Sequence, residues 1–343
     1  MVQARTLTVR ELNRATLARQ LLLERRRLPV VRALERLAGL QAQWAPAPYV
    51  GLWTRLAGFR RQTLERALLR EQAVRAVLMR GTIHLVSRRD YGIFGSAVDL
   101  PSWVRPEAAQ LADGVHDSLR EFGREPRTRA EVLAWLRETH RIDHDGGAGL
   151  WYALRTAGRL THAPASGAWK QPRETRYVLI DHEQIDPLPA RQRLVRAYLG
   201  AFGPATRADI AEWSGLRVRD FEPALDALEP LRRFRDERGR DLLDLPRCPL
   251  PPADSPTPVR LLPRFDNLLL SHADRTRVIS DEHRRIVIHG GGMVEATFLV
   301  DGFVAGLWRV EGNRVRIEQF APLPRVARRE AEDEAARLEA WLC

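Results

Sequence analysis

The sequence has few of the residues that build covalent or metal-bound scaffolds. Among 343 residues there are two cysteines, Cys248 and Cys343, and neither begins a C-x-x-C pair. A disulfide framework, a Cys-ligated iron–sulfur cluster and a Cys-rich zinc finger are therefore excluded. No apolar run approaches the roughly 18 residues that span a membrane, and Arg5 and Arg10 occupy the place of a secretory signal core. We expect a cytoplasmic protein with no membrane partner.

Lysine is almost absent as well. Lys170 is the only lysine, so arginine supplies 54 of the 55 basic side chains, against 44 acidic ones. The formal net charge of +11 and the pI near 10.8 favour a polyanionic partner such as nucleic acid, which binds with release of counterions. Charge alone does not separate a DNA-binding protein from a merely basic one.

Common enzyme signatures are missing too: there is no H-E-x-x-H, G-x-S-x-G, Walker or G-x-G-x-x-G motif. His140 and His144 have the spacing of metal ligands on one helix face, but Gly146-Gly147 beside them indicates the end of a helix. The glycine run 290–292 is more typical of a hairpin turn than of a phosphate-binding loop. We therefore expect neither a metal nor a cofactor.

An internal repeat gives the first clue to the fold. Residues 128–135 and 206–213 both read T-R-A-acidic-aliphatic-x-x-Trp, which predicts a capping box followed by an amphipathic helix. A second helical stretch and then a strand–turn–strand follow each copy. Helix, helix, hairpin is the pattern of a winged helix, a helix-turn-helix variant. The second helices are expected over 149–158 and 220–231, and the hairpins over 159–180 and 233–245.

A third unit is predicted at the front of the chain. Residues 8–12 offer another capping box, a long helix is expected over 28–43, and strands over 75–79 and 83–86 flank a turn at 80–82. We thus predict an α+β protein with three tandem winged helices. Their bounds are 5–110, 111–187 and 188–250.

The Pro-rich segment 246–258 predicts a linker, and beyond it the predicted secondary structure changes from mainly helical to mainly strand-like. Short strand-like runs are separated by hairpin turns such as Asp301-Gly302 and Gly312-Asn313. We therefore predict a small antiparallel β-barrel over 256–343 that ends in a helix at 325–342. The expected strands are 259–262, 277–279, 285–289, 294–300, 303–308 and 314–320.

The segment Gln41-Ala42-Gln43-Trp44 stands out. Two glutamines two positions apart lie about 200° apart on an ideal helix. They can converge if the helix ends there, as Pro46 and Pro48 indicate. An exposed polar helix end without function is the alternative on spacing alone.

Two blocks resemble a known family. Gly-Leu-Gln-Ala-Gln at 39–43 and Arg-Gly-Thr-Ile-His-Leu at 80–85 resemble the AlkZ-like branch of the AlkZ/YcaQ winged-helix DNA glycosylases, and later blocks continue the similarity in order along nearly the whole chain. The resemblance implies three winged helices and a barrel that form a C-shaped DNA cradle. The branch carries Gln-x-Gln where the YcaQ-like branch carries Gln-x-Asp, which implies Gln41 and Gln43 as catalytic residues. The later blocks are 203–206, 213–216, 262–266 and 299–302.

The resemblance also implies a substrate class. It points to excision of bulky N7-alkylguanine adducts, often as self-resistance to a DNA-alkylating natural product, and leaves open whether interstrand crosslinks are also unhooked. An N7-alkylated guanine already carries positive charge, so it leaves without a strong general acid. A neutral carboxamide can orient water without titrating. We expect Gln43 to position the water and Gln41 to orient water or substrate, with the reverse assignment open, and activity that varies little with pH near neutrality.

The single lysine bears on the reaction type, because a glycosylase that also nicks the strand normally needs an amine for a Schiff base. Lys170 lies in the second predicted wing and is more simply a phosphate contact, so we predict a monofunctional enzyme. Whether the base is flipped stays open. The residues expected to contact DNA or lesion are Trp44, Arg80, Thr82, His84, Lys170, Arg264, Arg275, Arg277, His283, Arg284 and Arg285, the last five flanking one predicted hairpin.

A non-enzymatic winged-helix transcriptional regulator is the alternative, because that fold is better known for binding than for catalysis. A regulator would be expected to carry a dimerisation helix and a ligand or phosphorylation module. Three winged helices and a barrel in one chain suit a monomer that encloses one lesion in double-stranded DNA. We therefore favour the enzyme.

Overall fold

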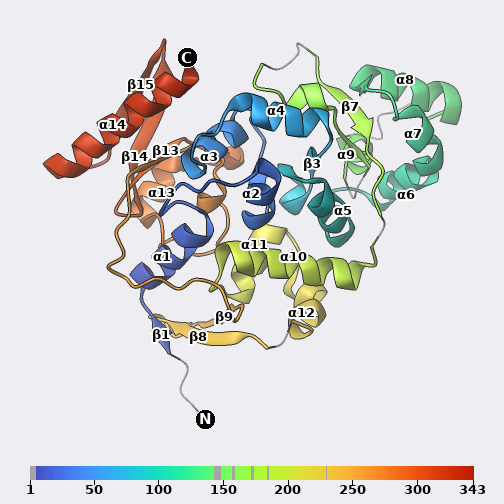
Figure 1. Ribbon diagram of the computed structural model, residues 1–343. Helices are drawn as coiled ribbons and strands as arrows, with labels where there is room; N and C mark the ends of the chain where they lie inside the picture. Colours follow the sequence, from blue (N-terminus) through green and yellow to red (C-terminus); the bar gives the residue numbers. More distant parts are fainter. Residues whose placement is uncertain (1–4, 143–147, 157–158, 171–173, 184, 229) are drawn as a thin grey trace.

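A computed structural model describes residues 5–142, 148–156, 159–170, 174–183, 185–228 and 230–343. His144, Gly146-Gly147 and Gly158 lie outside these ranges. The fold is mixed α+β, as predicted, with helices packed around several small sheets (Figure 1). No helix in the described ranges has the length and apolar character needed to cross a membrane.

The largest sheet has six strands in the order β2-β4-β3-β6-β7-β5. The hairpins predicted for the first two units are both present, and they join edge to edge where Arg75 pairs with His162. The sheet therefore crosses the predicted boundary at 110. Its strands are β2 (Leu40–Gln41), β3 (Ala73–Val77), β4 (Ile83–Ser87), β5 (Arg127–Thr128), β6 (Leu160–His162) and β7 (Arg176–Leu179).

The first two predicted units contain nine α-helices within the described residues. The capping boxes predicted at Thr8 and Thr128 are confirmed: each threonine hydroxyl accepts from the main-chain N–H of the third helical residue, a glutamate, and the threonine N–H donates to that glutamate's carboxylate. The helices are α1 (Val9–Arg19), α2 (Val30–Arg36), α3 (Ala47–Arg55), α4 (Arg61–Leu69), α5 (Arg88–Ala97), α6 (Pro106–Gly114), α7 (His116–Phe122), α8 (Arg129–His140) and α9 (Ala148–Ala153). Of these, α2, α3, α4, α5 and α8 contact strands of this sheet.

A three-stranded sheet joins the front of the chain to the third predicted unit. Here β1 (Thr6–Leu7) pairs in parallel with β8 (Arg232–Asp236), which is antiparallel to β9 (Asp241–Asp244). The helices are α10 (Pro187–Phe202), α11 (Arg207–Ser214), which begins at the predicted capping box, and α12 (Val218–Asp226). One apolar core joins Val74 and Val86 of the large sheet to Leu194 and Trp213, so the first and third units share a core.

The C-terminal strands do not close into the predicted barrel. The sheet β10-β13-β14-β15 is antiparallel and open, with β10 and β15 at its edges. Helix α14 (Arg325–Leu342), whose predicted bounds are correct, covers one face with Ala331, Ala335 and Leu338, so the apolar face is buried without barrel closure. The strands are β10 (Arg260–Leu262), β13 (Thr297–Val300), β14 (Phe303–Glu311) and β15 (Arg314–Gln319).

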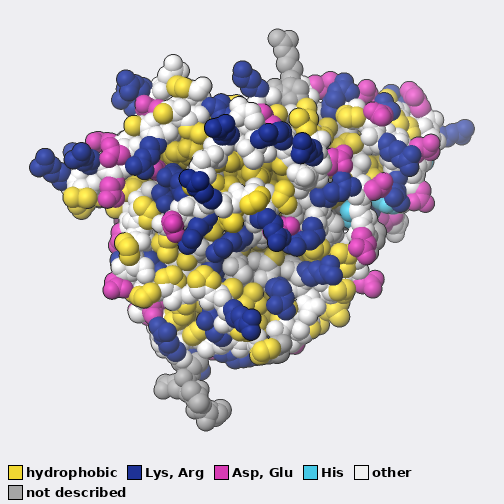
Figure 2. Space-filling view, in the orientation of Figure 1, with side chains coloured by type: hydrophobic (Ala, Val, Ile, Leu, Met, Phe, Trp, Pro, Cys, Tyr) yellow, Lys and Arg dark blue, Asp and Glu magenta, His cyan; other side chains and the backbone are white. Residues whose placement is uncertain are grey.

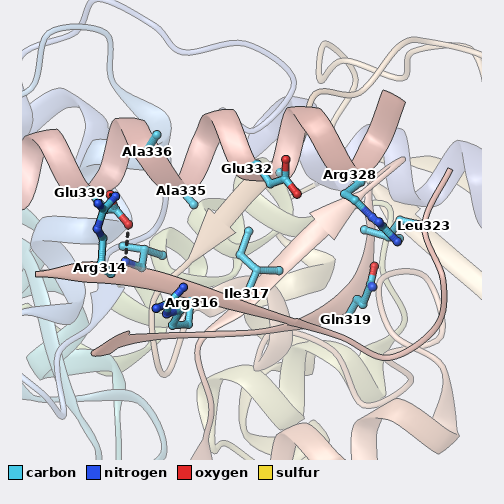
Figure 3. A pocket seen from close by; sticks show the side chains of 12 residues that line it. Arg314, Arg316, Ile317, Gln319, Leu323, Arg328, Glu332, Ala335, Ala336 and Glu339 are labelled. Carbon is cyan, nitrogen blue, oxygen red and sulfur yellow. Dashed lines mark hydrogen bonds and ion pairs between the residues drawn. The ribbon is translucent and has the colours of Figure 1, made fainter. Parts of the chain in front are cut away.

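A groove of about 490 Å³ remains between β15 and α14, where Arg314 pairs with Glu339 at 3.5 Å (Figure 3). Its lining residues all come from 314–339, so it is separate from the glutamine segment. Beside this sheet lies a small hairpin, β11 (Ile288–His289) and β12 (Met293–Val294), whose turn holds Gly290–Gly292. The glycine run therefore forms the hairpin turn that the sequence predicts.

Two further strand predictions are wrong. Residues 277–279 form a turn, and most of 285–289 belongs to α13 (Asp281–Val287). The side chain of Ser280 accepts a hydrogen bond from the His283 N–H, and Asp281 and Glu282 occupy the first turn, where acidic side chains favour a helix. These local signals outweigh the strand propensity of the β-branched residues that follow.

The helix predicted over 28–43 is much shorter than expected, since α2 ends at Arg36. Ala38 and Gly39 have φ values of 55° and 81°, in the left-handed region that stops a helix. A Cβ at Gly39 would lie 2.7 Å from Val86 Cγ1, so the close approach of β4 requires glycine. The chain then enters β2, and the two glutamines lie on and just after a strand.

Candidate active site

The main chain of the glutamine segment is held from the C-terminal part of the molecule. The Gln41 N–H donates to Asn267 Oδ1 at 2.9 Å, and Asn267 Nδ2 donates to the Gly39 carbonyl at 2.7 Å. Asn267 is buried at the start of the short 3₁₀ helix η3 (Asn267–Leu269). One side chain therefore fixes the residues on both sides of Leu40, although 226 positions separate it from Gln41.

A second pair of contacts holds the residue between the glutamines. The Ala42 N–H donates to the Ile83 carbonyl at 2.7 Å, and the Ala42 carbonyl accepts from Arg75 Nε at 3.1 Å and Nη2 at 2.9 Å. Arg75 Nη1 donates to the Ser166 carbonyl of the second predicted unit. Burial lowers the pKa of Arg75 to about 10, so the guanidinium stays charged near neutral pH.

The side chain of Gln41 is buried and bonded. Arg80 Nη2 donates to Gln41 Oε1 at 2.7 Å, and Arg80 Nη1 donates to the Trp213 carbonyl at the end of α11. Arg80 adopts a left-handed backbone conformation, with φ of 54°, in the β3–β4 turn. Burial lowers its pKa to about 10. The Gln41 carbonyl thus faces a cation, while its NH₂ group has no partner among the described residues.

The side chain of Gln43 is exposed, and within the part of the chain that the structure describes it has one hydrogen bond, from the Ile83 N–H to its Oε1 at 3.3 Å. One lone pair of that oxygen and both amide hydrogens stay available for water or substrate. The two carboxamides therefore differ: the first is fixed inside the protein, and the second is accessible from solvent.

His84 lies opposite Gln41 in the β2–β4 ladder and is buried. Its Nδ1 lies 3.0 Å from the Thr82 carbonyl, which can only accept, so Nδ1 carries the hydrogen and Nε2 a lone pair. No described residue donates to Nε2. Burial and the Arg80 charge lower the pKa of His84 to about 3, so the imidazole is neutral near pH 7.

Other predicted contact residues divide into exposed and bonded groups. Trp44, Lys170 and Arg285 are exposed. The remaining side chains have partners within the protein: Thr82 donates to the Met79 carbonyl, Arg264 pairs with Glu295, Arg284 pairs with Asp281, and His283 packs on Phe320.

Two of the predicted DNA-contacting arginines have structural partners. Arg277 is 5% exposed and donates to the Pro204 carbonyl, and Arg275 binds the Leu269 carbonyl and Glu212. The hairpin that they were expected to flank is instead a turn followed by α13. We therefore leave Arg275 and Arg277 out of the proposed DNA contacts.

Sequence reasoning missed the residues that position the segment. Asn267 follows Asp266, whose carboxylate forms a fully buried bidentate pair with Arg55, with both bonds at 2.8 Å. Polar residues within an apolar run, as in Leu-Pro-Arg-Phe-Asp-Asn-Leu, are the signal that marks such a buried network. Their partners near position 40 cannot be read from spacing.

One face of the molecule carries many basic side chains. Figure 2 shows Lys and Arg side chains gathered around a hollow near the middle of the view. Such a surface attracts a phosphate backbone.

Comparisons with known proteins agree with this picture. The family model described as DNA glycosylase AlkZ-like matches residues 34–341. A curated relative from Streptomyces sahachiroi, named interstrand DNA cross-link repair glycosylase, is 25% identical over 328 residues, 88% of each chain. The solved structure of S. sahachiroi DNA glycosylase AlkZ matches with a TM-score of 0.82 at 22% identity, covering 98% of this chain and 97% of that one.

The family match decides between the two interpretations of the sequence. It covers most of the chain, including the glutamine segment and the C-terminal sheet, and the family consists of enzymes. A transcriptional regulator is therefore not supported. This chain belongs to the AlkZ-like DNA glycosylase family, whose members are hydrolases that act on N-glycosyl bonds.

Proposed function

We propose that this chain is a monofunctional glycosylase that hydrolyses the C1′–N9 bond of cationic N7-alkylguanine in double-stranded DNA. The observation that carries the proposal is the fixed Gln-Ala-Gln segment, with Gln41 bonded inside and Gln43 exposed. Within the described residues, the hydrogen bonds to both side-chain carbonyls come from Arg80 and Ile83. Such a site offers uncharged dipoles and suits a leaving group that needs no proton.

The residues fit the reaction in the following way. When the C1′–N9 bond breaks, its electron pair moves to N9 and neutralises the positive charge of the alkylated base. A water oxygen bonds to C1′ and loses a proton to solvent. The free lone pair of Gln43 Oε1 accepts a hydrogen bond from that water. The Gln41 Oε1 already accepts a hydrogen bond from Arg80, so the Gln41 NH₂ group is the part of this side chain that donates to water or substrate.

The substrate range extends to large adducts. Because bulky N7 adducts and crosslinks through N7 share the same cationic leaving group, we include both and propose a role in self-resistance to a DNA-alkylating natural product. The name of the S. sahachiroi relative, which specifies crosslink repair, supports this range. The three helix–helix–hairpin units act as winged helices of a C-shaped DNA cradle in a monomer that binds DNA in the nucleoid.

Lys170 supports the monofunctional assignment. It is the only lysine, it is exposed, and it lies outside the bonded network around Gln41 and Gln43. The product is then an intact abasic site. Borohydride should trap no covalent protein–DNA complex during the reaction, and a trapped complex would contradict this assignment.

Base release is the direct test. A duplex with one N7-methylguanine is incubated with the protein, and hot alkali then breaks the strand wherever the base has been released. We expect enzyme-dependent breaks at the modified position and intact strands in the matched unmodified duplex. Binding in a gel shift without such breaks would refute the proposed activity.

A further inference from the structure

The side chain of His84 lies on the same face of the large sheet as that of Gln41. The two residues are directly opposite in the β2–β4 ladder. At the next position the Ala42 N–H donates to the Ile83 carbonyl. The Gln41 N–H points away from β4, to Asn267. Antiparallel ladders alternate, so Gln41 and His84 form a non-hydrogen-bonded pair, whose side chains approach closely, with Cβ atoms about 4.5–5.5 Å apart.

These two side chains carry complementary groups. Arg80 donates to Gln41 Oε1, so the NH₂ group of that carboxamide faces away from the guanidinium. The Thr82 carbonyl holds the hydrogen of His84 Nδ1, so Nε2 carries the lone pair. Among the described residues, neither the Gln41 NH₂ nor the buried His84 Nε2 has a hydrogen-bond partner. An unpaired donor and an unpaired acceptor thus occupy opposite positions in the ladder.

The charge state of His84 suits an acceptor. Burial and the nearby Arg80 charge lower its pKa to about 3, so Nε2 keeps its lone pair near neutral pH. A buried acceptor without a donor costs free energy, and a hydrogen bond from the Gln41 NH₂ would remove that cost.

We infer that His84 is a positioning residue for Gln41, and that its Nε2 accepts one hydrogen of the Gln41 NH₂ when the carboxamide engages the adduct. The inference rests on the proposed function. Arg80 and His84 then hold the two ends of the carboxamide, one at the oxygen and one at the nitrogen. The second hydrogen of the NH₂ group is left to donate to water or substrate. His84 acts through Gln41 and does not touch the reacting atoms.

A double-mutant cycle tests whether His84 acts through Gln41. Single-turnover rate constants for base release from the N7-methylguanine duplex are measured with wild type, His84→Phe, Gln41→Ala and the double variant. Phenylalanine keeps a planar ring in the buried position, and the Thr82 carbonyl keeps its hydrogen bond from the Leu78 N–H.

His116→Phe is the matched control. His116 lies on α7, and its buried Nδ1 also lacks a partner among the described residues. This substitution should leave the rate constant unchanged both in wild type and in Gln41→Ala.

We expect His84→Phe to lower the rate constant about tenfold in wild type, as loss of one hydrogen bond predicts, and less than about twofold in Gln41→Ala. Equal factors in the two backgrounds would mean that His84 supports the structure alone, and would overturn the inference. An unchanged rate constant in wild type would overturn it too, while the proposed function stands. If wild type releases no base, the proposed function itself fails.

A second measurement does not depend on base release. In protein labelled with ¹⁵N-histidine, the chemical shift of His84 Nε2 reports whether its lone pair accepts a hydrogen bond, and His84→Phe assigns the resonance. We expect this resonance to move upfield when the protein is saturated with a duplex that carries a cationic pyrrolidine in place of one deoxyribose. It should stay in place in Gln41→Ala. A wild-type resonance that does not move would contradict the positioning role.

Discussion

Gln41 and Gln43 are two residues apart and have opposite surroundings. Gln41 is 7% exposed, and its main chain and side chain are bonded to Asn267 and Arg80. Gln43 is exposed, and among the described residues only the Ile83 main-chain N–H donates to its side-chain carbonyl. The sequence leaves open which glutamine positions the water, and the fold gives the two side chains different surroundings.

The difference separates two tasks. A group that positions water must be accessible and keep a free lone pair, and Gln43 meets both conditions, which supports the role that we propose for it. A group that orients water or substrate, the role that we propose for Gln41, must be rigid, and Gln41 is held by bonds to the β3–β4 turn and to η3. Pre-organised dipoles of this kind act without reorganisation during the reaction.

The largest effect should follow removal of the exposed carboxamide. We expect Gln43→Ala to slow base release from the N7-methylguanine duplex by about 100-fold or more, because removing one pre-organised polar group from a transition state costs about that much. DNA affinity should change little. Single-turnover kinetics and a binding titration on the same duplex measure both quantities.

Gln62→Ala is the matched control, because Gln62 is exposed on α4 and has no bond to the glutamine segment. Unchanged excision by Gln43→Ala would assign the water to Gln41 instead. That outcome would reverse the two tasks.

The next largest effect should follow removal of Asn267, which holds the main chain of the glutamine segment. We expect Asn267→Ala to lower kcat about tenfold with a smaller change in KM, because small displacements of a catalytic group are costly. It should also reduce the free energy of unfolding by about 1–3 kcal/mol, since the Gly39 carbonyl and the Gln41 N–H lose their partner.

Chemical denaturation and steady-state kinetics separate these two effects. As a control for stability alone, Asn13→Ala removes another buried asparagine, which donates to the Arg277 and Gly302 carbonyls. If Asn13→Ala and Asn267→Ala lower kcat equally, the positioning role of Asn267 is disproved.

Much of the scaffold could be predicted from the sequence because its signals are local. The capping boxes at Thr8, Thr128 and Thr206 and the bounds of α14 depend on residues within one or two turns. The hairpins follow from turn residues. The joined six-stranded sheet and the open C-terminal sheet depend on contacts between distant segments, so local patterns could not reveal them.

The site was predictable only in part for the same reason. Resemblance to a family marked Gln41 and Gln43, but Asn267, which accepts from the Gln41 N–H, lies 226 positions away from it in the sequence. The sequence pattern also did not separate surface arginines from buried ones, because an arginine side chain can either face solvent or bond to main-chain carbonyls in the interior. Arg277 lies buried against the Pro204 carbonyl, whereas Arg285 is exposed and forms no ion pair with described residues.

This contrast gives a smaller predicted effect. Arg285→Ala should weaken binding to modified and unmodified duplex alike, by roughly threefold, and reduce the slope of log affinity against log salt by about one, as loss of one phosphate contact does. Arg329→Ala, on the exposed side of α14, is the control. An unchanged salt slope would remove Arg285 from the DNA interface.

The smallest effect on the rate should come from pH. His84, with a pKa lowered to about 3 by burial and the nearby Arg80, is neutral above pH 5, and Arg80, with a pKa lowered to about 10 by burial, is charged below pH 9. Neither group changes charge between pH 5 and pH 9, so the single-turnover rate constant should vary less than about twofold from pH 6 to 8.5.

Stability should respond to acid even though the rate does not. The unfolded chain binds a proton at His84 near the ordinary pKa of about 6.5, whereas the folded chain does not bind it until about pH 3. The free energy of unfolding therefore falls as pH drops through this window, and the thermal midpoint should fall with it. A rate constant that changes tenfold between pH 6 and 8.5 while the protein stays folded would reveal a titrating catalytic group and would contradict catalysis by neutral carboxamides.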